Sequence, residues 1–272
     1  MIFIATALYI EAKPIIEFYN LKKEINDTYF QIFRGDNIIL IITGVGKINS
    51  SIAVSHMLTS YFSNNTKDNI LNIGVCGTKD ETIEVGSLCY INKITDNETK
   101  RNYYPDILFK HNFLERDIET FSRVVKNTKD LNSSLCDMEA SGFFLASSKY
   151  LGPHRIHILK VVSDKLSSVF DKQIPYILIK NNIDNINTFI AYINEHFKNK
   201  EIFLTEEIEI LNTISDKLKL TASQKNILYK KALHYKVRTQ KNIKFLNEIY
   251  FKIPETKYER ENNFAEILTY LR

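Results

Sequence analysis

The heptapeptide CDMEASG, residues 136–142, is the stretch around which the rest of the chain is organised. It contains Glu139 and runs into an apolar segment, residues 138–146, which predicts the start of a buried helix. Ser133, Ser134 and Asp137 are each suited to cap that helix, so Glu139 is expected in its first turn. A carboxylate there lies near unpaired N–H groups, stays ionised and can accept hydrogen bonds from a pair of hydroxyls. The alternative is that Glu139 is an ordinary residue at the start of a helix, with no role in binding or catalysis.

The composition of the chain indicates a globular protein with a real core. Its 272 residues are 44% hydrophobic and 25% charged, which predicts one large domain or a main domain with an appendage. No stretch approaches the roughly 20 apolar residues of a membrane span, so a membrane partner is not expected. The three cysteines have neither the number nor the spacing of a disulfide framework or a zinc site. We therefore expect a reducing, cytoplasmic setting and no metal.

Strand and helix signals alternate over the first two hundred residues. Apolar runs that predict buried strands occupy residues 2–7, 38–42, 70–75 and 155–162, and helical spacing follows at 8–12, 47–62 and 175–197. This alternation predicts an α/β sheet covered on both faces. Ligands of such sheets bind beyond the carboxyl ends of the strands, where Glu11, Gly44, Gly74 and Asp164 fall.

The last part of the chain has a different character. Strand signals fade from residue 203, and helical spacing covers residues 206–220, 222–235 and 242–250. Residues 1–199 carry 22 basic and 22 acidic residues, whereas residues 200–272 carry 14 and 10. The sequence therefore predicts two domains, an α/β domain at 1–199 and a small all-α extension at 200–272.

Three acidic residues at strand or helix ends are candidates for chemistry: Glu11, Glu139 and Asp164. Taken singly, each has a plain alternative, since an Asp after a strand is often a turn former and a Glu in a first helical turn is favoured by the helix field. The segment TGVGK at 43–47 lacks the third glycine of a dinucleotide fingerprint and the spacing of a phosphate loop. These residues alone leave the chemistry open.

Five short motifs in a fixed order give the chain a family resemblance. They are ALYIE at 7–11, TGVGK at 43–47, NIGVCG at 72–77 with VGS at 85–87, DMEA at 137–140 and VSD at 162–164. In this order they resemble the purine nucleoside phosphorylase/methylthioadenosine nucleosidase superfamily over residues 1–198. The resemblance implies a three-layer mixed α/β sheet of the nucleoside phosphorylase/hydrolase type and cleavage of the N-glycosidic bond of a purine nucleoside. It also implies that no cofactor is needed and that the chain forms a homo-oligomer, a dimer or larger.

The resemblance also implies roles for particular residues. Asp164 would protonate N7 of the base and so improve the leaving group, and Glu11 would activate water. Glu139, with Met138 beside it, would hold the 2′- and 3′-hydroxyls of the ribose. The turn from Gly74 to Gly77 would let backbone approach the sugar and base, which Cβ atoms would obstruct. The expected substrate-binding set is Glu139, Met138, Asn72, Gly74, Cys76, Gly77, Ser163 and Phe121.

The choice between water and phosphate depends on two positions. Glu11 is present, and Asn72 stands where the hexameric phosphorylases have a phosphate-binding arginine, so the resemblance favours a nucleosidase. A phosphate-dependent phosphorylase is the alternative. Val75 replaces a serine that helps hold the nucleophile, and the interval from Gly77 to Glu139 is short, with Phe121 as the candidate for base stacking. These departures motivate a third hypothesis, a degenerate nucleoside-binding module that regulates a partner.

A basic segment, residues 217–244, motivates a nucleic-acid alternative. It contains nine basic residues and no acidic one, interleaved with Tyr229 and Tyr235 and followed by Phe245. Such residues can contact phosphates and stack on bases. Charged helix faces are usually only solvated, so nucleic-acid binding is the less favoured hypothesis.

Overall fold

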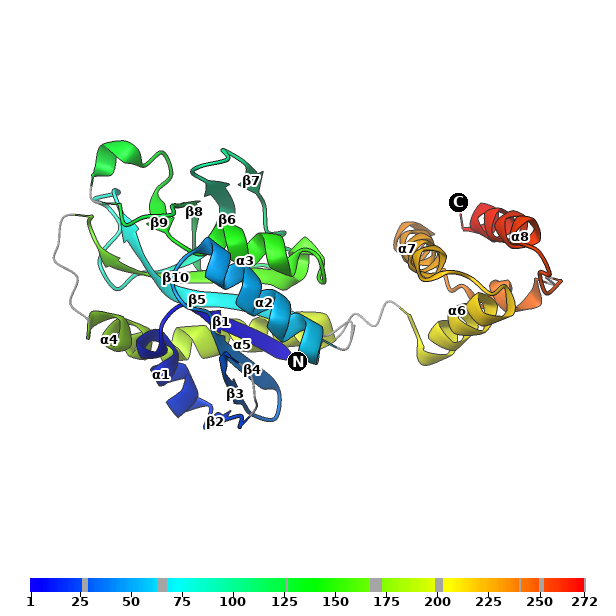
Figure 1. Cartoon of the computed structure of the whole chain (residues 1–272), viewed down its shortest axis with the longest axis horizontal. Coiled ribbons are helices and arrows are strands. Elements are labelled where there is room, and N and C mark those ends of the chain that lie inside the picture. The colour runs from blue at the N-terminus through cyan, green and yellow to red at the C-terminus, as the bar shows by residue number, and fades with distance from the viewer. Residues whose placement is uncertain are drawn as a thin grey trace. The chain divides into compact units, whose positions relative to one another are not determined.

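The computed structural model describes residues 1–25, 29–62, 68–125, 127–166, 173–198, 203–239, 241–249 and 252–271. The chain divides into two compact units, Met1–Lys198 and Asn199–Arg272 (Figure 1). The boundary expected near residue 200 falls on residues 199–202, which lie outside the described residues. Within the described part of the chain, no helix is long and apolar enough to cross a membrane.

One mixed sheet of ten strands forms the centre of the first unit in its described residues. The strands are β1 (Ile2–Thr6), β2 (Lys22–Lys23), β3 (Gln31–Arg34), β4 (Ile38–Ile42), β5 (Asn69–Thr78), β6 (Leu88–Asp96), β7 (Asn102–Tyr103), β8 (Leu114–Thr120), β9 (Leu135–Asp137) and β10 (Ile156–Asp164). Their order is β10-β6-β8-β9-β5-β1-β4-β3-β2, with β7 paired to β6. Because β10 also pairs with β5, strands β5, β10, β6, β8 and β9 close into a ring.

The strands before Glu11 and Asp164 run in the same direction, whereas β9, before Glu139, is antiparallel to β5. β1 lies between β4 and β5 and is parallel to both, and β10 is parallel to β5 on its other side. Their carboxyl ends therefore meet at one edge of the sheet, as expected for a ligand site in an α/β fold.

Helices cover both faces of the sheet, so the predicted three-layer α/β class is confirmed. α1 (Tyr9–Phe18), α4 (Ile174–Asn181) and α5 (Ile183–Lys198) pack on one face, with a core that includes Ile15, Ile179 and Phe189. α2 (Lys47–Tyr61) and α3 (Ala140–Ser147) cover the other face (Figure 1). Met57 and Phe143 are fully buried there. Short 3₁₀ turns occupy Thr128–Asp130 and Pro153–Arg155.

A glycine brings α2 and α3 together at their N-terminal ends. An ideal Cβ at Gly142 would lie 2.0 Å from the carbonyl oxygen of Lys47, so no side chain fits there. Ser51 Oγ donates a hydrogen bond to the Gly142 carbonyl over 3.0 Å. This close packing holds the start of α3, with Glu139, beside the start of α2, with Gly46.

The second unit is helical, as predicted. It contains α6 (Thr205–Lys217), α7 (Ala222–Thr239), a 3₁₀ helix at Lys244–Glu248 and α8 (Lys257–Tyr270) around a small apolar core. Glu207 is fully buried and accepts hydrogen bonds from the N–H groups of Leu204 (2.8 Å) and Ile243 (3.0 Å) and from Lys236. The Glu207 carboxylate therefore joins three parts of this unit.

Two helix predictions were wrong in detail. The single helix predicted at 175–197 is broken at Asn182, whose side-chain amide donates to the carbonyls of Leu178 (3.0 Å) and Gly86 (2.9 Å). The helix predicted at 242–250 is only a short 3₁₀ turn, Lys244–Glu248. α8 was not predicted, although Thr256 and Glu259 form a capping box at its start.

Candidate active site

Glu11 lies just beyond β1, in the first turn of α1, and its carboxylate is fixed by backbone. Oε2 accepts a hydrogen bond from the Leu8 N–H (2.9 Å), and Oε1 accepts one from the Val75 N–H (3.0 Å). The side chain is buried, which raises its pKa, while Lys160 and these N–H groups oppose the rise. Glu11 is thus a rigidly held carboxylate with increased basicity.

Glu139 is the N-cap of α3, so its predicted place in the first turn was wrong. The Glu139 side chain makes no capping hydrogen bond, and Asp137 Oδ2 accepts the Ala140 N–H over 2.9 Å in its place. Glu139 Oε1 accepts the Gly46 N–H of the neighbouring helix start over 2.9 Å. Burial raises the pKa of Glu139 to about 7, and Lys160 opposes this rise.

Lys160 is a central residue that the sequence did not reveal. It is paired with Gly74 in the β10–β5 register, and its Nζ lies 2.9 Å from Asp137 Oδ2 and 4.0 Å from Glu139 Oε2. An ideal Cβ at Gly74 would lie 3.0 Å from Glu11 Oε1 and 3.6 Å from Lys160 Nζ, which places both groups beside Gly74. Burial disfavours the charged amine, but these carboxylates raise its pKa. A lysine inside the apolar strand ILKVV was the available signal, because fully buried lysines are almost always paired.

Asp164 ends β10 and is half-buried. Its Oδ1 accepts the Leu166 N–H over 2.8 Å, and its Oδ2 lies 2.7 Å from Ser163 Oγ, which is also 3.1 Å from the Cys76 carbonyl oxygen. An ideal Cβ at Gly77 would lie 3.3 Å from Asp164 Oδ1. Asp164 and Ser163 thus lie against the Gly74–Gly77 segment of β5.

Of the other predicted residues, one is half-buried and three are buried. Met138 is half-buried next to Glu139. Asn72 and Cys76 are only 2% and 3% exposed, and the Asn72 amide donates to the Ala5 carbonyl over 3.1 Å, so both belong to the interior of the sheet. Phe121 is buried in a small apolar cluster with Leu131, Cys136 and Leu166.

The Gly74–Gly77 segment is the common feature of the site. Glu11, Glu139 and Lys160 gather at its first half, and Asp164 lies at its end. Three residues of strand span about 10 Å. Glu11, Glu139 and Lys160 therefore lie near one end of this segment and Asp164 lies near the other.

Metal and thiol chemistry find no support among the described residues. They contain no group of three or more His, Cys, Asp or Glu side chains that could hold a metal ion. The three cysteines are free and buried, and burial raises the pKa of Cys136 to about 12, so that its thiol is protonated at neutral pH.

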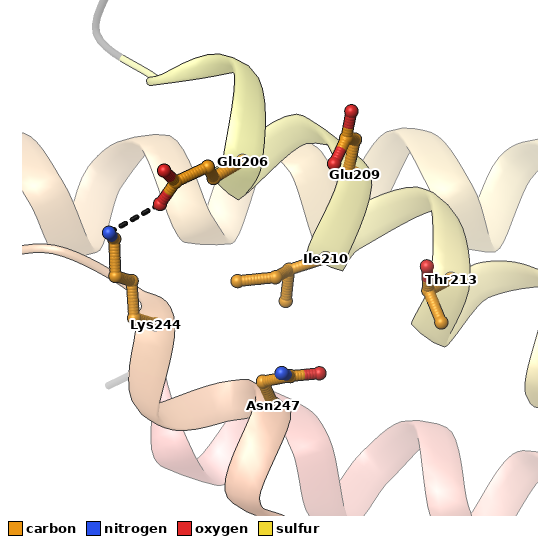
Figure 2. Close-up of a pocket in the computed structure, with 6 residues that line it drawn as sticks. All are labelled: Glu206, Glu209, Ile210, Thr213, Lys244 and Asn247. Carbon is orange, nitrogen blue, oxygen red and sulfur yellow. Dashed lines mark ion pairs between the residues drawn. The ribbon is translucent and has the colours of Figure 1, made fainter.

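A surface hollow in the helical unit is lined by Glu206, Glu209, Ile210, Thr213, Lys244 and Asn247 (Figure 2). Lys244 and Glu206 form an ion pair across it. Lys225 and Lys236 are also paired, with Asp216 and Glu207. Part of the basic charge in residues 217–244 is therefore neutralised within this unit.

About 70% of the chain has the fold of solved nucleosidase structures, which confirms the predicted resemblance at the level of the fold. The structure is similar to 5′-methylthioadenosine/S-adenosylhomocysteine nucleosidase from Campylobacter jejuni, with 18% identity and a TM-score of 0.57 over 70% of this chain and 97% of that one. It is also similar to the 5′-methylthioadenosine nucleosidase of Arabidopsis thaliana (14% identity, TM-score 0.61, 71% and 95% coverage). Futalosine hydrolase of Helicobacter pylori is another similar structure (14% identity, TM-score 0.55, 72% and 97% coverage).

No family model matches the sequence, and no curated protein matches it. The similarity is therefore one of fold, and the activity of this chain has to be argued from its own residues.

Proposed function

We propose that the chain is a purine nucleosidase, which uses water to cleave the N-glycosidic bond of a nucleoside of the methylthioadenosine or adenosylhomocysteine kind. The observation that carries this proposal is the gathering of Glu11, Glu139 and Lys160 at one end of Gly74–Gly77, with Asp164 at the other. Residues 1–199 would form the catalytic domain and residues 200–272 an extension.

Departure of the base would depend on Asp164. In its protonated form Asp164 donates the proton to N7 of the purine, and the electron pair of the C1′–N9 bond moves to the base as the bond breaks. Ser163 Oγ and the Leu166 N–H fix the carboxyl group at the end of β10, so the donor is positioned before substrate binds.

Attack on the sugar would depend on Glu11. The carboxylate takes a proton from water while the water oxygen bonds to C1′ of the oxocarbenium-like ribose. Val75 stands where the family has a serine, and its backbone N–H donates a hydrogen bond to the Glu11 carboxylate. This contact does not depend on the side chain, so it is kept although the serine hydroxyl is lost. The raised pKa of Glu11 increases its strength as a base.

Ribose binding would fall to Glu139 and Met138, while Lys160 acts as a positioning residue. Lys160 lowers the pKa of both Glu11 and Glu139 and so keeps them available as hydrogen-bond acceptors. The three carboxylates around this one ammonium group, Asp137 included, leave net negative charge that favours a cationic sugar.

Water is favoured over phosphate as the nucleophile. The Lys160 ammonium is already paired with Asp137 at 2.9 Å, and nearby Glu11 and Glu139 would repel a phosphate ion. Asn72 is occupied with the Ala5 carbonyl. There are two alternatives to the nucleosidase. The first is a phosphate-dependent phosphorylase, and the second is a nucleoside-binding regulatory module.

The setting of this activity belongs to the proposal as well. Three free, buried cysteines suit a reducing cytoplasm. We expect a homo-oligomer that uses no cofactor and no membrane. Nucleic-acid binding through residues 217–244 stays less favoured, because Lys225, Lys236 and Lys244 are in ion pairs.

Base release decides between these functions. The protein is incubated with methylthioadenosine, adenosylhomocysteine, adenosine and inosine, each with and without phosphate, and the free base is measured. Release without phosphate supports the nucleosidase, whereas strict dependence on phosphate supports the phosphorylase. Saturable nucleoside binding with no release supports the regulatory module.

A further inference from the structure

Leu166 has a backbone conformation that leucine seldom adopts. Its φ is +64°, in the left-handed region, where a Cβ is crowded by the neighbouring backbone. The side chain is nevertheless only 7% exposed. Non-glycine residues keep such a conformation only where their surroundings hold it, and they concentrate at ligand sites and switches.

The Leu166 side chain lies directly on Gly77. An ideal Cβ at Gly77 would be 2.4 Å from Leu166 Cδ2, so the leucine fills the space that the glycine leaves open. Phe121, Leu131 and Cys136 surround it in one buried apolar cluster. The backbone N–H of the same leucine donates to Asp164 Oδ1 over 2.8 Å, which fixes Leu166 to the proposed general acid.

In the proposed reaction, the leaving base would lie at this location. A base that accepts a proton from Asp164 has to lie within hydrogen-bond distance of that carboxyl group, against Gly77 and next to the apolar wall that includes Phe121. A flat apolar ring and the Leu166 side chain cannot occupy the same space.

We infer that Leu166 obstructs the base position: its side chain occupies the space on Gly77, and a purine binds only after displacing it. This inference rests on the proposed function. The larger the base, the more completely the leucine has to leave its cluster. Full exposure of a buried leucine corresponds to about a 10- to 100-fold loss of affinity. The loss of affinity should be smaller for a pyrimidine than for a purine, because a pyrimidine is smaller.

The test is equilibrium binding of free adenine and free uracil to the full chain by calorimetry, which needs no turnover. Leu166→Ala removes the obstacle and keeps the strained backbone, and Leu166→Gly also removes the strain. Leu131→Ala is the matched control, because it deletes a buried leucine from the same cluster without uncovering Gly77. Circular dichroism checks that each variant is folded.

Both Leu166 variants should bind adenine about 10- to 100-fold more tightly than the wild type, with a smaller gain for uracil, and Leu131→Ala should show no gain. The same affinity for adenine in all four proteins, or no adenine binding in any of them, would overturn the inference. A gain confined to Leu166→Gly would also overturn it, since the backbone and not the side chain would then be the obstacle. Tighter adenine binding in the folded variants, together with no base release by the folded wild type, would support the inference and contradict the proposed hydrolysis.

Discussion

Replacing Lys160 with methionine tests the part of the site that the sequence did not reveal. The substitution keeps much of the apolar stem and removes the ammonium group, which lies 2.9 Å from Asp137 and 4.0 Å from Glu139 inside the protein. Removing one partner of a buried ion pair costs about 3–5 kcal/mol, because the remaining charge is buried without compensation. A unit of this size loses about 2–4 °C in Tm per kcal/mol, so we expect Tm to fall by about 6–20 °C.

The pH dependence of that loss separates an electrostatic role from simple packing. Lys160 lowers the pKa of both Glu11 and Glu139, so both values should rise further in Lys160→Met. Protonated carboxyl groups no longer need the ammonium group, and the pKa of Glu139 is about 7 even in its presence. The loss of stability should therefore be smaller at pH 5 than at pH 8, and any base release should decline at a higher pH than in the wild type.

The assay is calorimetry of the full chain at both pH values, with Lys13→Met as the control. The Lys13 side chain is 44% exposed and lies 3.8 Å from Glu17, a pair whose loss should change stability by less than about 1 kcal/mol. If Lys160→Met has the Tm of Lys13→Met at pH 5 and at pH 8, the ammonium group does not hold the carboxylates and the reasoning is refuted.

Three further predictions concern the ribose site, the helix contact and the extension. The native pKa of Glu139 is raised above 4.5 to about 7, so wild-type stability should fall as pH rises through this range, by up to about 3 kcal/mol; urea titrations should show that Glu139→Gln lacks this part of the decline. Gly142→Ala forces a Cβ against the Lys47 carbonyl, 2.0 Å away, and should cost at least about 1–3 kcal/mol in the same titration; an unchanged midpoint would contradict the tight contact of α2 with α3. The full chain should bind an RNA oligonucleotide only with non-specific affinity, about 10⁻⁴–10⁻⁶ M at physiological salt, since part of the basic charge in 217–244 is in ion pairs; nanomolar affinity in a salt-titrated assay would contradict this.

The sequence predicted the fold class because the main parallel strands are buried on both faces and are therefore apolar throughout. β8 was missed because its sequence, LERDIET, looks like a polar loop. The structure explains its polar residues. Glu119 is fully buried and accepts hydrogen bonds from the Asn97 amide (2.8 Å) and the Asn132 N–H (2.8 Å), and Asp117 accepts the Ser134 N–H (2.9 Å).

Part of the candidate site could be predicted because some of its residues lie at the ends of strands and helices. Glu11, Glu139 and Asp164 follow strands or begin helices, and such ends have recognisable patterns. Lys160 and Leu166 belong to no pattern of that kind. The importance of Lys160 comes from carboxylates distant in the chain, and that of Leu166 comes from a left-handed φ and its contact with Gly77. The lysine within ILKVV signals a buried pair, but only the tertiary structure shows its partners and the conformation of Leu166.

The most direct test of the proposed function is adenine release from methylthioadenosine in phosphate-free buffer, measured for the wild type, Asp164→Asn and Glu11→Gln. The wild type should release adenine, and each variant should be slower by about 10²–10⁴-fold while its circular dichroism spectrum is unchanged. Full activity of Asp164→Asn, or no release by the folded wild type in any oligomeric state, would contradict the proposed mechanism.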